Sequence, residues 1–393
     1  MMSGLPLWAD LSFSVLPQQL VNGLLLGAIY ALIALGYTMV YGVLRLINFA
    51  HGEVYMLGGY VALFISWQFG FTQDALMQNS TREGSLLLLG LMLIASMLIC
   101  GFIGLLIEFL AYRPMRSQPR IAALITAIGV SLLLQYAGAL FLPNSPPPSI
   151  SEKVNPYRGE WRITLSQPSG ESVAALAAAK ATLDQRTREF DEQIKQERSK
   201  FDLSPAGVAI RDEKNRADQE FNKAQTVVNA QRSEIVLPRG QVVMFITSIL
   251  LMLGLNLLVN FTKMGRAMRA ASHDFDTASL MGINVNKVVT LTFFIGSALA
   301  GAGAMMNTTF LGTPMTTFSG VQPGVKAFVA AVLGGIGSIP GAVLGGLLMG
   351  MAETLVVWLG YGSYRDAVAF VILILVLLFR PGGIMGSAAV EKV

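Results

Sequence analysis

Residues 85–111 read SLLLLGLMLIASMLICGFIGLLIEFLA, and this stretch decides the class of fold because Glu108 is its only charged residue. A helix needs about 20 mainly apolar residues to cross the hydrocarbon core of a bilayer. Comparable apolar blocks lie on both sides of it, at residues 18–42, 46–69, 121–142, 239–261, 287–311 and 366–380. The pattern predicts an all-α, polytopic integral membrane protein.

A further apolar block, residues 326–358, is long for one helix and is interrupted by GGIGSIP, Gly334–Pro340. Apolar segments broken by glycine and proline are typical of two short helices or a re-entrant pair. We therefore expect about eight to nine transmembrane or re-entrant helices in the whole chain.

The composition excludes several classes of protein. Hydrophobic residues make up 53% of the chain and charged residues 13%, with a mean hydropathy of +0.57, whereas soluble domains carry about 25% charged residues. The single Cys100 excludes a disulfide within one chain. His51 and His273 lie in different segments, without metal-ligand spacing, and the chain has no GxxxxGK[ST] phosphate loop. We therefore expect no enzyme activity, no metal site, no cofactor and no ATP-binding site in this chain.

Basic residues predict how the spans are oriented. Two basic clusters follow the blocks that end at residues 111 and 261, and they comprise Arg113, Arg116, Arg120, Lys263, Arg266 and Arg269. Such clusters favour the cytoplasmic side, so the N-terminus is expected outside. If residues 326–358 cross twice, as we favour, Arg380 and Lys392 are cytoplasmic too. The N-terminus has no basic region before its first apolar block, so we expect that block to remain as a span.

Residues 143–238 differ from the N-terminal part, 1–142, and the C-terminal part, 239–393. They hold 14 basic and 14 acidic residues, so the net charge of +4 comes from the membrane portion and does not indicate nucleic-acid binding. A possible strand, WRITLS at 161–166, precedes two helical stretches around DLSPAG at 202–207. The first stretch repeats Leu176, Leu183 and Phe190 at seven residues, with Ile194 and Phe201 following. The second keeps strict spacing of four and three residues through Ile210, Lys214, Ala217, Phe221, Ala224, Val228, Gln231 and Ile235.

This spacing predicts an inserted extracytoplasmic hairpin of two coiled-coil-like helices. Three interpretations stay open for it: a solvated spacer, a contact arm for an extracytoplasmic partner, and a contact between subunits.

Polar residues within apolar blocks are candidates for a translocation path, because an ionised side chain at a helix centre costs about 3 kcal/mol. Asn48 and His51 in INFAHGE are expected to share a helical face, with open space beside Gly52. The candidates are Asn22, Asn48, His51, Glu53 and Glu353. The alternative for each is a structural hydrogen bond to a neighbouring helix, and Glu108 is expected to pair with Arg113.

A polar segment, GRAMRAASHDFDTASLMGINVN at 265–286, separates two of the spans. The 3-4-3 spacing of Met268, Ala271, Phe275 and Ala278 predicts one stripe of an amphipathic helix, and Gly282 is a candidate for its end. A short amphipathic helix between two spans suggests a docking surface.

Four stretches of this sequence resemble the permease subunits of branched-chain amino acid ABC importers. They are QQLVNGLLLGAIYALIALGYTMVYGVLRLINFAHGEVYMLGGY, GRAMRAASHDFDTASLMGINVNKVVTLTF, VKAFVAAVLGGIGSIPGAVLGG and AVAFVILILVLLFRPGGIMG. The resemblance covers residues 18–142 and 239–386. Residues 143–238 depart from it, because family members usually carry a much shorter external loop there.

The resemblance implies a multi-pass permease of the bacterial inner membrane that forms a translocation path for branched-chain or related amino acids. Its implied partners are a second, related permease, two ATPase subunits that bind ATP and Mg²⁺, and an extracytoplasmic solute-binding protein. The polar segment would be a coupling helix with an EAA-xxx-G pattern. Its implied coupling residues are Asp276, Thr277, Ala278, Gly282 and Ile283, where Asp276 and Thr277 replace the Glu and Ala of the pattern.

Two alternatives to this function remain. A urea or short-amide ABC importer has a similar permease, whereas a secondary transporter would be driven by an ion gradient without ATPase partners. The scarcity of acidic residues within the spans argues against the secondary transporter.

Overall fold

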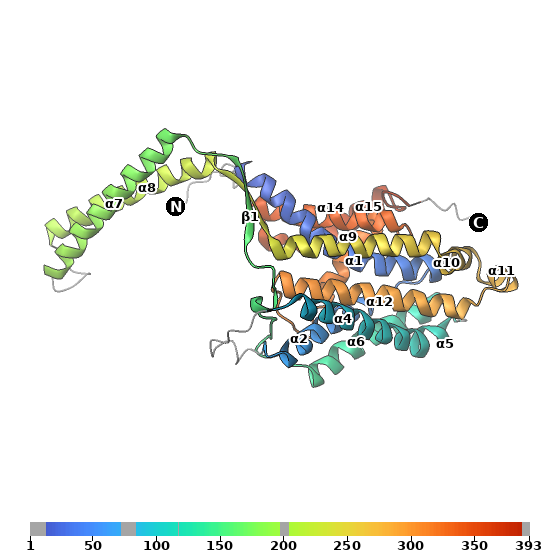
Figure 1. The fold of residues 1–393 in the computed structure, drawn as a ribbon. Helices are drawn as coiled ribbons and strands as arrows, with labels where there is room; N and C mark the ends of the chain where they lie inside the picture. The colour runs from blue at the N-terminus through green and yellow to red at the C-terminus, as the bar shows by residue number, and fades with distance from the viewer. Residues whose placement is uncertain (1–12, 72–83, 117, 197–203, 387–393) are drawn as a thin grey trace. The chain divides into compact units, whose positions relative to one another are not determined.

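The computed structural model describes residues 13–71, 84–116, 118–196 and 204–386 of the chain (Figure 1). It divides into two compact units. Unit 1 combines the N-terminus up to residue 18 with residues 161–236, and unit 2 combines residues 19–160 with residues 237–393.

Six helices of the described chain are long and apolar enough to cross a membrane. They are α1 (Leu16–Leu44), α4 (Leu86–Ile107), α6 (Arg120–Phe141), α9 (Arg239–Phe261), α12 (Val285–Phe310) and α14 (Ile339–Trp358). Three shorter helices accompany them: α2 (His51–Gln68), α13 (Val321–Gly334) and α15 (Ala367–Phe379). The prediction of an all-α, polytopic membrane fold is therefore confirmed.

Short elements complete unit 2. A π-helical turn, η3 (Glu108–Tyr112), and α5 (Arg113–Met115) extend α4, and α10 (Lys263–His273) and α11 (Phe275–Leu280) connect α9 to α12. Single 3-10 turns lie at η4 (Glu152–Val154) and η5 (Gly362–Tyr364). In unit 1, a further 3-10 turn, η2 (Phe13–Val15), precedes α1.

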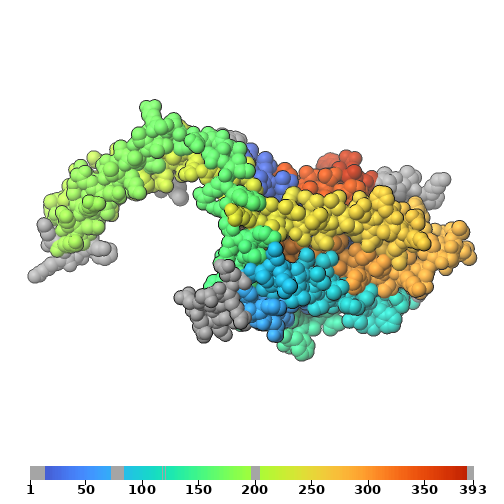
Figure 2. All heavy atoms as spheres, in the orientation of Figure 1, coloured from blue at the N-terminus to red at the C-terminus, as the bar shows by residue number. Residues whose placement is uncertain are grey.

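The core of unit 2 is built from α1, α2 and α12, with α4 packed on both α2 and α12. Small residues allow these backbones to approach closely: a Cβ added to Gly58 of α2 would lie 2.6 Å from Cα of Gly301 in α12. This close packing stabilises association where lipid provides no hydrophobic drive. By contrast, α4 and α9 present exposed leucines on a face that Figure 2 shows in cyan and yellow.

The ambiguous block at 326–358 is two helices, as the interrupting glycines indicated. The helix α13 ends at Gly334 and α14 begins at Ile339, and the turn between them holds Gly335 and Gly337 at φ of 105° and 97°. Backbone N–H groups of the tail, at Ile384 and Met385, donate to carbonyl oxygens of the last α13 turn at 2.8 and 2.9 Å. The C-terminal tail therefore lies at the α13–α14 turn.

The same end of unit 2 carries α10. Arg45, just beyond α1, donates to the Ser272 carbonyl of α10 at 3.3 Å. A Cβ at Gly42 of α1 would lie 3.7 Å from Gly337 in the α13–α14 turn. The described part of the C-terminal tail and α10 therefore lie at the same end of unit 2. Two crossings by residues 326–358 require this arrangement. Lys392 lies outside the described residues.

Unit 1 is a helical hairpin on a two-stranded sheet. Its helices are α7 (Gly170–Gln196) and α8 (Pro205–Gln231), and its strands are β1 (Glu160–Ser166) and β2 (Ser233–Pro238). Arg186 of α7 pairs with Glu213 of α8 at 2.9 Å, and Ala217 and Val228 of the predicted apolar stripe are buried.

The sheet corrects one part of the hairpin prediction. Ile235 does not continue the second helix, because the chain becomes extended after Gln231 and pairs with β1 as β2. The predicted strand WRITLS lies within β1, while Phe201 lies outside the described residues.

Candidate functional site

A cavity of about 240 Å³ in unit 2 contains one of the predicted path residues, Glu53. Glu53 sits in the first turn of α2, is 3% exposed and accepts a hydrogen bond of 2.5 Å from Gln135 of α6. The lining residues are Tyr37, Phe49, Gly52, Glu53, Ile128, Ser131, Leu132, Gln135, Gly320, Val321, Gly324, Val325 and Phe328. The cavity therefore places one carboxylate and one amide against a largely apolar wall.

Asn48 and His51 do not line this cavity. His51 begins α2, whereas Asn48 lies in the connection before it, so the predicted shared helical face is wrong. His51 Nε2 lies 3.2 Å from the Ile33 carbonyl oxygen. Asn48 Oδ1 accepts a hydrogen bond of 3.1 Å from the Tyr112 hydroxyl. Both side chains hold the α1–α2 connection against neighbouring helices.

Gly52 lines the cavity, but no open space lies where its side chain would be. A Cβ at Gly52 would lie 2.6 Å from the carbonyl oxygen of Gly320, so backbone occupies the space that the absent side chain leaves. Gly52 therefore serves close packing of α2 against the segment that leads into α13. Asn22 is half-buried on α1 and is outside the cavity lining.

A second polar cluster surrounds Glu353, which is fully buried on α14. Glu353 accepts hydrogen bonds of 2.7 Å from the Tyr30 hydroxyl of α1 and from Lys326 Nζ of α13, and it also pairs with Arg365. Lys326 in turn pairs with Asp366 at 2.7 Å. Buried charges need such partners because desolvation is costly, so this cluster ties α1, α13, α14 and the start of α15 together.

Sequence reasoning named Glu353 but missed Lys326. Lys326 is 5% exposed and lies at the first residue of the ambiguous apolar block, where a lone lysine among apolar residues was a signal for a buried partner. Sequence reasoning also missed Gln135, although it is a polar residue within the apolar helix α6.

The polar segment at 265–286 is not one helix. It divides at Asp274, whose carboxylate caps α11 by accepting N–H groups of Asp276 and Thr277 at 2.8 and 3.1 Å and the Thr277 hydroxyl at 2.9 Å. These hydrogen bonds, chiefly from Thr277, lower the pKa of Asp274. The predicted continuous stripe is therefore interrupted, because Asp274 leaves the helical conformation to act as a cap.

The described coupling candidates lie on and just after α11. Asp276 and Thr277 are exposed, Ala278 is 4% exposed against the bundle, and Ile283 is half-buried. Gly282 has φ of +83°. Just after it, the N–H of Ile283 donates a hydrogen bond of 3.0 Å to the Ala278 carbonyl at the end of α11. Gly282 thus ends the helix through a left-handed residue, which glycine adopts without steric cost.

The tip of this segment also carries an apolar pair that the sequence analysis did not select. Leu280 and Met281 are 88% and 79% exposed. Apolar side chains this exposed at the end of a polar helix point to a contact with another molecule.

In the described part of the chain, no group of three His, Cys, Asp or Glu residues could hold a metal ion.

Comparison with known proteins gives a consistent set of relatives. The family model described as "Branched-chain amino acid transport system / permease component" matches residues 19–377. The chain is 38% identical, over 96% of its length and 97% of the relative's, to the high-affinity branched-chain amino acid transport system permease protein BraD of Pseudomonas aeruginosa. It is 37% and 36% identical, over the same shares, to the LivH permease proteins of Salmonella typhimurium and Escherichia coli K12. No solved structure matches the chain.

Proposed function

The chain belongs to the family of branched-chain amino acid transport system permease components, and we propose that it forms one half of the path by which an ABC importer moves these amino acids across the inner membrane. It is a multi-pass membrane protein and a transport component rather than an enzyme. In the proposed assembly a second, related permease supplies the other half of the path.

The cavity at Glu53 has the chemistry that a branched-chain amino acid requires. Glu53, oriented by Gln135 at 2.5 Å, can accept hydrogen bonds from an α-ammonium group. Ile128, Leu132 and Phe328 of the same lining can contact an aliphatic side chain. Glu353 then serves as a structural anchor, because its carboxylate already has three partners.

The observation that carries the coupling proposal is the exposed apolar tip of α11. Leu280 and Met281 would enter a groove of an ATPase subunit, while Asp276 would meet basic groups at the rim. Gly282 and the buried Ala278 connect this tip to α12, so a movement of the ATPase would reach the spans.

Two ATPase subunits would bind ATP and Mg²⁺, since this chain has no phosphate-binding loop of its own. An extracytoplasmic solute-binding protein would deliver the amino acid. Its ligand decides between branched-chain amino acids and urea or short amides, so identifying the ligand of the co-purifying binding protein tests the substrate.

Gly282 provides the test of coupling. Replacing Gly282 with Arg forces a residue that has a Cβ and a long cationic side chain into φ of +83°, and we expect ATP-driven uptake in sealed vesicles to be abolished while membrane insertion stays intact. Gly282→Asn is the matched control, because asparagine tolerates the left-handed region and no atom lies within 4 Å of the added Cβ.

Normal uptake by Gly282→Arg would refute the coupling role. Uptake that follows an ion gradient in vesicles without ATP would refute the importer itself.

A further inference from the structure

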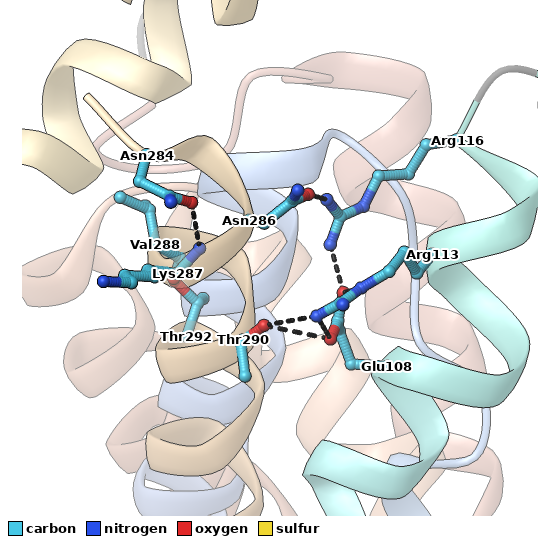
Figure 3. Close-up of polar contacts among 9 residues, drawn as sticks. All are labelled: Glu108, Arg113, Arg116, Asn284, Asn286, Lys287, Val288, Thr290 and Thr292. Carbon is cyan, nitrogen blue, oxygen red and sulfur yellow. Dashed lines mark hydrogen bonds and ion pairs between the residues drawn. The ribbon is translucent and has the colours of Figure 1, made fainter. Parts of the chain in front are cut away.

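Glu108 lies fully buried where α4 passes into its π-helical turn, and basic residues surround it (Figure 3). Arg113 donates to its two carboxylate oxygens at 3.2 and 2.9 Å, which confirms the predicted pairing. Arg116 pairs with Glu108 as well, and the Thr290 hydroxyl of α12 donates to it at 3.0 Å. This cluster joins η3 and α5 to the first turns of α12.

The cluster has more positive than negative charge, because two guanidinium groups face one carboxylate (Figure 3). Lys287, an exposed residue of α12, lines the adjoining hollow together with Arg113, and its side chain extends away from the Glu108 cluster. Asn286 does not offset this excess, because it is neutral and accepts from Arg116 at 2.7 Å. Glu108 is the one acidic residue among the described residues that line the adjoining groove.

That groove consists of two adjoining hollows of about 590 and 400 Å³, which share Leu105, Arg113 and Thr290. Its polar part is formed by Arg113, Asn284, Asn286, Lys287 and Thr290. Its apolar part is formed by Phe102, Leu105, Leu106, Phe109, Leu291 and Phe294. Basic groups therefore stand above an apolar slot between α4 and α12.

The groove lies at the boundary of the spans. Leu105 is two helical turns before Arg113 on the continuous span Leu86–Met115, and Phe294 is nearly two turns after Lys287 on α12. The apolar part therefore faces the hydrocarbon core while the basic part is level with the membrane surface. Phe102 and Leu106 are 59% and 57% exposed, so the slot opens to the outside of the chain.

We propose that this groove binds an anionic phospholipid of the leaflet on the α10 side, with its phosphate between Arg113 and Lys287 and an acyl chain along Phe102, Leu105 and Phe294. The recognised chemistry is a phosphate, and the apolar slot assigns it to a lipid rather than to the free ion. A protein neighbour is disfavoured because it would have to bring a matching acidic group to the basic end. The lipid connects η3 to the start of α12, close to where the chain returns from α11.

The test compares lipids retained by the protein after reconstitution in nanodiscs of equal parts phosphatidylcholine and phosphatidylglycerol. Native mass spectrometry of the released protein should show retained phosphatidylglycerol in excess over phosphatidylcholine. Lys287→Gln should reduce that excess about five-fold, the effect of one basic residue near an anionic surface. Lys287 is exposed, so this change leaves the fold intact.

Lys263→Gln is the matched control, because Lys263 is an exposed lysine on α10 and lies outside the groove. It should leave the lipid ratio unchanged. An equal loss in both variants, no preference in the unaltered protein, or full displacement by millimolar inorganic phosphate would overturn the proposal. Loss of a second permease subunit, rather than lipid, from Lys287→Gln would also overturn it, by assigning the groove to a protein contact.

Discussion

At the scale of single residues, the buried charges show how the spans depend on one another. Glu353 is fully buried and Lys326 is 5% exposed, and each compensates the other across α13 and α14. Removing one partner of such a pair leaves the other with less compensation for its desolvation. The cluster therefore makes a strong structural prediction that does not depend on the transported solute.

Glu353→Gln should lower the free energy of unfolding by about 3–5 kcal/mol, because Lys326 loses its buried partner. Thermal unfolding in nanodiscs measures this effect, with loss of uptake as the functional consequence.

Asp366→Asn is the control for that prediction. It removes the other carboxylate of Lys326 at the same distance of 2.7 Å, but Asp366 is 56% exposed, so its loss should cost less than about 1 kcal/mol. Equal destabilisation by the two variants would contradict a dominant role for burial.

At the scale of elements, the break at Asp274 turns one expected helix into two. The cap lets α11 begin in a new direction, with Ala278 against the bundle and Leu280 exposed. The six residues of α11 are too few to form a stable helix alone, so its conformation depends on the cap at Asp274 and the left-handed Gly282.

Asp274→Ala should reduce ATP-driven uptake several-fold, because α11 loses its N-terminal cap, whereas Asp274→Asn should retain most of the activity. Uptake at saturating ATP measures both. Equal defects in the two variants would show that the charge of Asp274, rather than its capping geometry, is required.

The pH dependence of this cap follows from the lowered pKa of Asp274. A carboxylate with a depressed folded-state pKa contributes stability above its unfolded value of about 4 and loses it only as the pH falls through the depressed value. The ratio of Asp274→Ala to unaltered uptake should therefore be constant from about pH 6 to 8.

At the scale of the whole molecule, the chain consists of two separately compact units. The insertion leaves and re-enters unit 2 at adjoining points, because the Arg239 N–H donates to the Gly159 carbonyl at 3.1 Å. Ser169 and Gln231 are likewise bonded at 3.0 Å beyond the other ends of β1 and β2, so the strands run antiparallel. The membrane unit therefore does not require the hairpin to close its chain.

Replacing residues 168–231 with an Asn-Gly turn should leave the melting temperature of the membrane unit and its uptake unchanged, because the turn can join antiparallel strands directly. Melting and uptake in nanodiscs and vesicles test this. A weaker affinity for the solute-binding protein would instead identify the hairpin as a contact arm, and loss of the second permease would identify a subunit contact.

Much of the architecture is readable from local sequence. Apolar length determines the spans, and the glycines at 334–337 separate α13 from α14. A seven-residue repeat predicts α7, and spacing of four and three residues predicts α8. The strand β2 was missed because Ile235 fits the helical spacing equally well, and pairing with β1 decides its conformation.

The apolar stretch at 85–111 by itself determined that this chain spans a membrane. Removing so much apolar side-chain surface from water is favourable however the neighbouring helices are arranged. Tertiary structure alone decided which polar residues far apart in sequence meet. Glu53 faces Gln135 across 82 positions of sequence, and Lys326 faces Glu353 across 27. Sequence spacing cannot encode such pairs, because the crossing and rotation of separate helices are set by close packing between them.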